Sequence, residues 1–396
     1  MKLCLNDMLL AFSNALDIAE KRCFHTTDLH GKRVAYFSLL LGQYFHFKEQ
    51  DLDNLLGCAI LHDNGLTEFY HYNGNVEEDE FLRIQCQAGE ENIKYLKFYP
   101  KVKKVIQYHH EKANGTGPFQ KTSEETPLFA QLIHITDWAD IHYDFHTMTK
   151  STYEQMIQDM NHLRNSEFDD SIVDAFIGAI SFQTIKESQK DIDKILRQTM
   201  NHNVLKFNDA DMLSICYLFA NIIDSKSPFT KSHSLGVANK ILSMCVHYHY
   251  DNQRIIHMFF AGAMHDVGKL IIDRDILEKP DRLTQEEFIN IKNHAYYTYQ
   301  ILNEMNLGDI VHHAAFHHEK LDGSGYPFGK KAEELDFNDR LVACCDIYQA
   351  LREKRSYKEP YSHSKAIDIM RDMVNKGQID GQIVEDMDQV FKEYEA

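Results

Sequence analysis

The sequence has few residues that interrupt helices or crosslink secreted domains. Only seven prolines occur in 396 residues, and no convincing series of alternating strands is present, which argues against an all-β protein. The eight cysteines form no CxxC pair and no regular framework. We therefore expect no disulfide scaffold, and reduced thiols fit a cytoplasmic protein.

Long hydrophobic runs are also missing. No segment approaches the run of about 18 apolar residues that a membrane span needs. The N-terminal segment is interrupted by Asn6, Asp7, Asp17 and Glu20. The sequence therefore predicts neither a membrane anchor nor a secretory signal.

Positive charge is scarce. The chain has 42 Lys and Arg against 60 Asp and Glu, a net charge of −18, which opposes binding to polyanionic DNA or RNA. A nucleic-acid polymer is therefore not expected as a partner. A small anionic substrate stays open, because bound cations can reverse the field inside a pocket.

Apolar residues recur at helical spacing along much of the chain. One such stripe contains Leu235, Ala238, Ile241, Leu242 and Cys245. This pattern predicts a mostly α-helical chain, and the length exceeds that of a usual single domain. We therefore expect an all-α protein with more than one domain.

One motif set occurs twice. His30 and LHDNGL at 61–66 reappear 203 residues later as His233 and MHDVGK. HHEKANGTGPF at 109–119 reappears as HHEKLDGSGYPF at 317–328, and Asp137 reappears as Asp346. A repeat of this length predicts two tandem copies of one helical domain.

The boundary between the copies is expected near residue 205. This gives domains at 1–205 and 206–396, with a polar, helix-like connector near 170–202.

Imidazole and carboxylate groups gather in the second copy. HDVGKL at 265–270 is followed by His294, by HHEKLDGSGYP at 317–327 and by Asp346 inside an apolar segment. These groups bind hard or borderline divalent metals, and a carboxylate among apolar neighbours needs such a partner. The pattern is typical of a metallohydrolase.

From about residue 224 to 361 the chain resembles the HD-GYP phosphodiesterases, a branch of the HD superfamily that hydrolyses cyclic dinucleotide second messengers. The features that carry the resemblance are His233, the HD pair with Lys269, His294, His317 and His318, DGSGYP at 322–327, Asp346 and RSYK at 355–358.

The resemblance implies two HD-like helical bundles and a dinuclear metal centre in the second. One metal would be held by His233, His265, Asp266 and Asp346, and the other by His294, His317 and His318, with Asp266 bridging. Iron is the expected metal and manganese a common substitute. Some relatives hold a third metal through a Glu one helical turn before the first His; Phe229 stands there, so two metals are expected.

The resemblance also implies roles around the metals. Two cations would activate a water that attacks the phosphodiester, with Asp266 and Lys269 as the catalytic residues. Lys269 would stabilise the phosphate and protonate the leaving oxygen. Arg355 and Lys358 resemble a second phosphate clamp, and Tyr326 is expected to shape the pocket and touch the substrate.

The first copy lacks several of these groups. Leu66 stands at the position of Lys269, Gln85 at that of His294, and the Tyr of the loop is missing. We therefore expect it to be catalytically inactive, with a regulatory or architectural use that includes packing on the active copy. A residual site for one metal is expected at His30, His62, Asp63 and Asp137.

The leading hypothesis is a cytoplasmic phosphodiesterase that opens cyclic di-GMP or 3′,3′-cyclic GMP-AMP to the linear 5′-phosphorylated dinucleotide, and on to mononucleotides. One alternative is another HD phosphohydrolase acting on nucleotides. A second alternative is a non-catalytic signalling scaffold. A homodimer is only the base-rate expectation for soluble oligomers.

Overall fold

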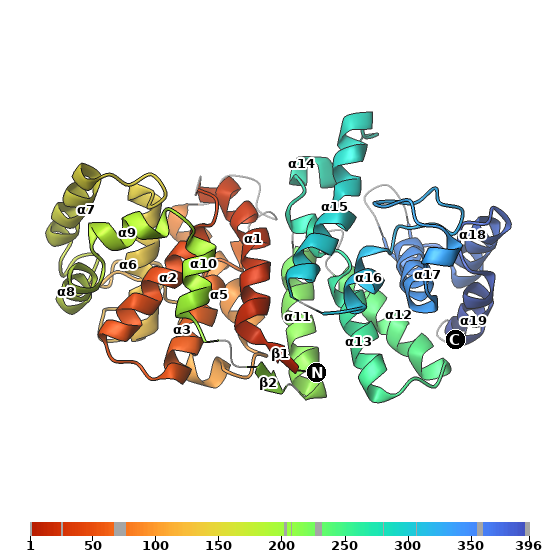
Figure 1. Ribbon diagram of the computed structural model, residues 1–396, viewed down its shortest axis with the longest axis horizontal. Helices are drawn as coiled ribbons and strands as arrows, with labels where there is room; N and C mark the ends of the chain where they lie inside the picture. The colour runs from red at the N-terminus through yellow and green to blue at the C-terminus, as the bar shows by residue number, and fades with distance from the viewer. Residues whose placement is uncertain are drawn as a thin grey trace. The chain divides into compact units, whose positions relative to one another are not determined.

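The protein consists of two compact helical units, residues 2–206 and residues 207–396 (Figure 1). The computed structural model describes residues 2–24, 27–66, 77–201, 204–206, 208–225, 232–279, 281–305, 307–354 and 359–392. Within these residues the only strands are β1 (Lys2–Cys4) and β2 (Val204–Lys206), which pair antiparallel with Leu3 opposite Leu205. The predicted all-α fold class is confirmed.

The first unit contains the helices coloured from red to yellow-green in Figure 1. They are α1 (Leu5–Phe24), α2 (His30–Tyr44), α3 (Glu49–Ile60), α5 (Glu78–Ile93), η1 (Tyr99–Lys101), α6 (Leu128–Tyr143), α7 (Lys150–His162), α8 (Asp170–Ala179), α9 (Phe182–Ser188) and α10 (Ile192–Thr199).

The second unit follows, coloured from green to blue. Its helices are α11 (Asp209–Ser225), α12 (His233–His247), α13 (Asn252–Met264), η2 (Val267–Leu270), α14 (Arg274–Leu277), α15 (Gln285–Glu304), α16 (Ile310–Ala315), η3 (Ala332–Glu334), α17 (Phe337–Arg352), α18 (His363–Asn375) and α19 (Gly381–Lys392).

The apolar stripe predicted for residues 235–245 lies in α12 and faces the core of the second unit. Ile241 and Cys245 are fully buried there with Leu341 and Cys345 of α17. Burying one of the larger apolar side chains, such as Ile or Leu, stabilises the folded state by about 1.5–3 kcal/mol. This packing holds the start of α12 beside the middle of α17.

A glycine sets the approach of η2 to α15. A Cβ on Gly268 would lie 2.0 Å from the carbonyl oxygen of His294, which no side chain tolerates. A Cβ on Gly65 in the first unit would lie 2.1 Å from the carbonyl oxygen of Gln85. The two units therefore share this packing, and Gln85 occupies the place of His294.

No helix among the described residues combines the length and the apolar character required to cross a bilayer.

Candidate metal centre

The seven predicted ligands of the second unit come from five segments. His233 is the first residue of α12, His265 and Asp266 lie between α13 and η2, and His294 lies within α15. His317 and His318 follow α16, and Asp346 lies within α17. His265 caps α13 with helical backbone angles (φ −55°, ψ −31°), whereas Asp266 departs from them (φ −102°, ψ 11°). The helix end therefore changes the relative direction of two adjacent side chains that a continuous helix would point about 100° apart.

The first ligand group lies around one carboxylate oxygen of Asp346. Its Oδ1 is 3.2 Å from Nε2 of His233 and 3.8 Å from Nε2 of His265. Oδ2 of Asp266 is 3.2 Å from Nε2 of His265 and 3.6 Å from Nε2 of His233. These four side chains are buried, and they converge on one point.

The second group lies on the other side of Asp266. Its Oδ1 is 3.4 Å from Nε2 of His294 and 3.8 Å from Nε2 of His317, and the two imidazole nitrogens are 3.1 Å apart. His318 completes the group, with its ring centroid 5.0 Å from that of His294. Asp266 therefore directs one oxygen at each group.

The ligand atoms have the spacing of a cation site. Nε2 of His265 and Oδ1 of Asp266 are buried and make no hydrogen bond among the described residues, although neighbouring nitrogens and oxygens lie 3.2–3.8 Å away. An unpaired buried polar atom is costly. A metal at about 2.0–2.2 Å from each atom would satisfy them, so the residues fit a divalent ion.

Backbone carbonyls orient the imidazoles. Nδ1 of His265, His294 and His317 lies 2.7, 2.6 and 2.7 Å from the carbonyl oxygen of Gly262, Ile291 and Ala314, respectively. A ring whose Nδ1–H donates to a carbonyl keeps a lone pair on Nε2. Each Nε2 is therefore available as a ligand.

The protonation states differ between the two ligand groups. Against the effect of burial, neighbouring carboxylates raise the pKa of His233 to about 10, and they also raise the pKa of His265, so these two rings must lose a proton to bind a metal. Burial lowers the pKa of His294 to about 4 and that of His317 to about 3, so both rings are neutral at pH 7. Burial would raise the pKa of Asp266, but His265 and Lys269 outweigh it and hold that pKa well below its usual range. Neutral imidazole and ionised carboxylate are the forms that bind metals.

Glu353 supports His233 from behind. Its Oε2 lies 2.8 Å from Nδ1 of His233, and Gln349 donates to its Oε1 at 2.6 Å. We expect Glu353→Gln to weaken metal affinity about 10- to 100-fold, the usual cost of losing such a partner. Metal titration against a competing chelator measures this. Unchanged affinity would mean that Glu353 does not position His233.

Three residues around the centre escaped the sequence analysis. Glu353 is one, although another carboxylate, Asp144, stands at its repeat position in the first unit. Asp224 accepts from the backbone NH and hydroxyl of Ser234, which fixes the start of α12 next to His233. Glu319 accepts from the backbone NH groups of Phe328 and Lys330 and closes the DGSGYP loop. Its repeat partner Glu111 could have revealed it.

Of the four residues predicted to contact the substrate, the structure describes Lys269 and Tyr326. Nζ of Lys269 is 2.5 Å from Oδ2 of Asp266, and its side chain remains 22% exposed. The ring of Tyr326 lies 4.7 Å from that of His318, centroid to centroid. Arg355 and Lys358 lie outside the described residues. Lys269 and Tyr326 therefore border the ligand cluster.

The first unit keeps one ligand group. Nε2 of His30 is 3.1 Å and Nε2 of His62 is 3.6 Å from Oδ1 of Asp137, and Nε2 of His62 is 3.5 Å from Oδ2 of Asp63. Nε2 of His62 makes no hydrogen bond among the described residues. These four residues fit a single cation.

The second group is altered in the first unit. The Gln85 amide donates a hydrogen bond to Oδ1 of Asp63, the oxygen that corresponds to Oδ1 of Asp266. This oxygen still lies 3.5 Å from Nε2 of His109, but because an amide N–H now donates to it, less of its lone-pair capacity is open to a metal. The neighbouring Cys86 forms with His109 and His110 a group close enough to share a cation. Its Sγ, however, faces Nδ1 of His109 at 3.9 Å, and that nitrogen already bonds the Ile106 carbonyl at 2.6 Å.

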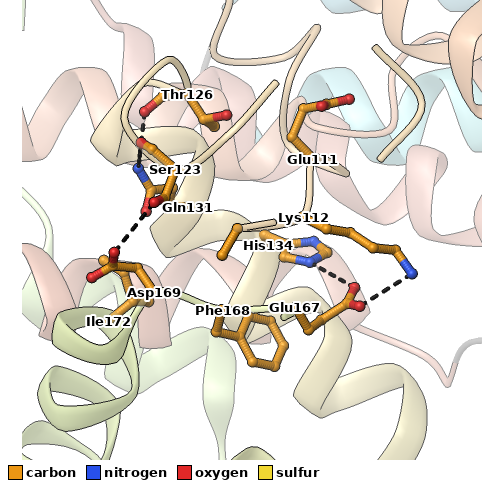
Figure 2. Close-up of a pocket in the computed structure, with 11 residues that line it drawn as sticks. Glu111, Lys112, Ser123, Thr126, Gln131, His134, Glu167, Phe168, Asp169 and Ile172 are labelled. Atoms are coloured by element: carbon orange, nitrogen blue, oxygen red, sulfur yellow. Dashed lines mark hydrogen bonds and ion pairs between the residues drawn. The ribbon is translucent and has the colours of Figure 1, made fainter. Parts of the chain in front are cut away.

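A small polar hollow lies elsewhere in the first unit (Figure 2). Figure 2 shows Glu167 between His134 and Lys112, with ion pairs of 3.1 Å to each. Gln131 donates to the carbonyls of Ser123 and Thr126. None of the predicted site residues lines this hollow, so it is separate from the ligand cluster.

Comparisons with known proteins agree with the geometry. Residues 27–141 and residues 217–383 each match the description HD domain. The 3′3′-cGAMP-specific phosphodiesterase 1 of Vibrio cholerae is 27% identical over 377 residues, covering 89% of this chain and 85% of that protein. The 3′3′-cGAMP-specific phosphodiesterase 3 of the same organism is 30% identical over 306 residues, covering 76% and 65%.

The chain also matches a relative over a shorter segment and a solved structure over nearly its whole length. A cyclic di-GMP phosphodiesterase of Thermotoga maritima is 42% identical over 106 residues, covering 26% of this chain and 28% of that protein. The crystal structure of a cyclic GMP-AMP specific phosphodiesterase of V. cholerae has the same fold, with a TM-score of 0.67, 22% identity and coverage of 99% and 98%. The resemblance to the HD-GYP phosphodiesterases is confirmed, and the chain belongs to the HD domain proteins, with two HD domains in tandem.

Proposed function

We propose that the second unit is a metal-dependent phosphodiesterase that hydrolyses a cyclic dinucleotide, 3′,3′-cyclic GMP-AMP or cyclic di-GMP, to the linear 5′-phosphorylated dinucleotide. The observation that carries this proposal is the arrangement of Asp266, whose two oxygens face two groups of buried imidazoles. The V. cholerae relatives, named for 3′3′-cGAMP, support the substrate class and place it ahead of other nucleotides.

Two divalent cations fit the two ligand groups, with iron the expected metal and manganese a substitute. The first would be held by His233, His265, Asp266 and Asp346, and the second by His294, His317 and His318. When bound, the pair would supply an activated water and positive charge at the diester oxygens.

Side chains around the two ligand groups position the imidazoles and contact the substrate. Glu353 and the backbone carbonyls hold the imidazoles in place. Lys269 lies beside Asp266 and is still partly exposed. Its ammonium group contacts a phosphoryl oxygen and donates a proton to the departing sugar oxygen. Tyr326 covers His318 and forms the wall toward the substrate.

Lys269→Ala should lower kcat about 100- to 1,000-fold while the protein keeps its metal, because this change removes charge stabilisation and a proton donor but no ligand. Turnover assays combined with elemental analysis measure the two effects. A variant that loses metal as well would assign Lys269 a structural role.

Product chromatography tests the function directly. The wild-type protein, loaded with iron or manganese, is incubated with cyclic di-GMP, 3′,3′-cyclic GMP-AMP and cyclic di-AMP, and the linear products are separated. Cleavage of a guanine-containing ring supports the proposal. Metal-loaded protein that cleaves none of the three, but hydrolyses another nucleotide, would place it with the other HD phosphohydrolases; no hydrolysis at all would favour a scaffold.

The first unit is proposed to be inactive and to hold at most one metal, at His30, His62, Asp63 and Asp137. The support is the Gln85 amide on Asp63 and the presence of Leu66, a buried apolar side chain, at the position of Lys269. Without a second metal and a phosphate-binding cation, this unit is suited to regulation or architecture.

A further inference from the structure

A lysine that has no role in the centre described above lies beside its entrance. Lys292 is on α15, two residues before His294. Its Nζ lies 5.1 Å from the ring centroid of Tyr326 and 4.6 Å from that of Phe288. Tyr326 in turn contacts His318. One aromatic ring therefore separates the Lys292 ammonium from the second ligand group.

The charge of Lys292 is available to a ligand. Lys269, Lys279 and Lys330 form ion pairs with Asp266, Glu287 and Glu334. Among the described residues no carboxylate forms an ion pair with Lys292. An ammonium held over ring faces keeps its N–H donors for an anion.

An exposed ring adjoins this ammonium. Phe288 is 49% exposed, and its ring lies 4.6 Å from Nζ of Lys292. Nucleobases stack on exposed aromatic rings of this kind. A cation and a stacking surface thus stand side by side.

The first unit lacks this arrangement. Arg83 occupies the equivalent position, two residues before Gln85, and its Nε donates to the carbonyl oxygen of Pro118. The loop there has no tyrosine. At the positions that the structure describes in both units, the unpaired cation and its rings therefore occur in the unit with the complete ligand set and not at the equivalent place in the first unit.

We propose that Lys292 and Phe288 form a subsite for the part of a cyclic dinucleotide that is not cleaved. Lys292 binds the second, non-scissile phosphate, and Phe288 stacks on a base. This inference rests on the proposed function. A cyclic dinucleotide carries two phosphodiesters, and only one reaches the ligand cluster and Lys269. Lys292 offers the other a cation beside Tyr326, in addition to Arg355 and Lys358, which lie outside the described residues.

The test compares Lys292→Gln with the wild-type protein on two substrates. For the cyclic dinucleotide we expect KM to rise about 10- to 100-fold with kcat nearly unchanged, since a contact made equally in the ground and transition states affects binding alone. For bis-p-nitrophenyl phosphate, which has a single phosphate, we expect no change. Phe288→Ala should likewise raise only KM for the dinucleotide.

Lys330→Gln is the matched control. Lys330 also lies over an aromatic ring, 5.3 Å from the centroid of Phe316, but it is paired with Glu334. It should leave both substrates unaffected. If Lys292→Gln changes neither substrate, or slows both equally, the subsite does not exist.

Equilibrium binding separates this proposal from the proposed function. Titration calorimetry with 3′,3′-cyclic GMP-AMP needs no turnover. If the wild-type protein binds the dinucleotide without cleaving it, weaker binding by Lys292→Gln supports the subsite while the hydrolase proposal fails. If the wild-type protein neither binds nor cleaves any cyclic dinucleotide, both proposals fail.

Discussion

Asp266→Asn should abolish hydrolysis of the cyclic dinucleotide, with a loss of about 1,000-fold or more, equivalent to about 4 kcal/mol of transition-state stabilisation. The reason is that Asp266 approaches both ligand groups closely, with Oδ2 3.2 Å from Nε2 of His265 and Oδ1 3.4 Å from Nε2 of His294. An amide offers one neutral oxygen in place of two charged ones. Steady-state kinetics with metal analysis measure the effect.

Asp63→Asn is the matched control in the first unit. Asp63 stands at the repeat position of Asp266, but one of its oxygens bonds Gln85. Most activity should remain in this variant. A large loss in Asp63→Asn without unfolding would contradict the assignment of hydrolysis to the second unit, and so would substantial activity in Asp266→Asn.

His294→Gln should remove one of the two metals from the second unit and lower kcat about 100-fold or more, because one cation cannot clamp both oxygens of the displacement. The first unit already shows the expected geometry: an amide at this place donates to the bridging carboxylate instead of leaving it open to a metal. Elemental analysis of the protein gives the metal content per chain.

The reciprocal change Gln85→His is its control. It adds an imidazole beside Asp63 and should raise the metal content without raising the rate, because Leu66 supplies no cation for the phosphate. If His294→Gln keeps its full metal content and activity, the second ligand group does not bind a metal.

The repeat made the ligand residues predictable, because its offset relates His30 to His233 and Asp137 to Asp346. It could not predict their contacts: His233 and Asp346 are far apart in sequence, and only the packing of α12 on α17 brings Nε2 and Oδ1 to 3.2 Å. The repeat also aligns Gln85 with His294. The equivalent close approaches of Gly65 to Gln85 and of Gly268 to His294 support this alignment.

The groups that support the ligands were not predictable in the same way. Glu353 contacts His233 across the fold, whereas in the first copy Asp140, and not Asp144 at the repeat position of Glu353, bonds Nδ1 of His30 at 2.6 Å. A carboxylate therefore supports the first imidazole in both units but comes from a different helical turn. Lys292 was missed because a lysine on an exposed helix turn reads as a solvated side chain.

Anomalous diffraction from crystals of the full chain grown with manganese tests the central claim most directly. Two peaks are expected in the second unit, one beside His233 and Asp346 and the other beside His294 and His317, with Asp266 contacting both. In the first unit at most one peak is expected, beside His62 and Asp137. An empty cluster in the second unit, or a metal pair in the first, would contradict the account.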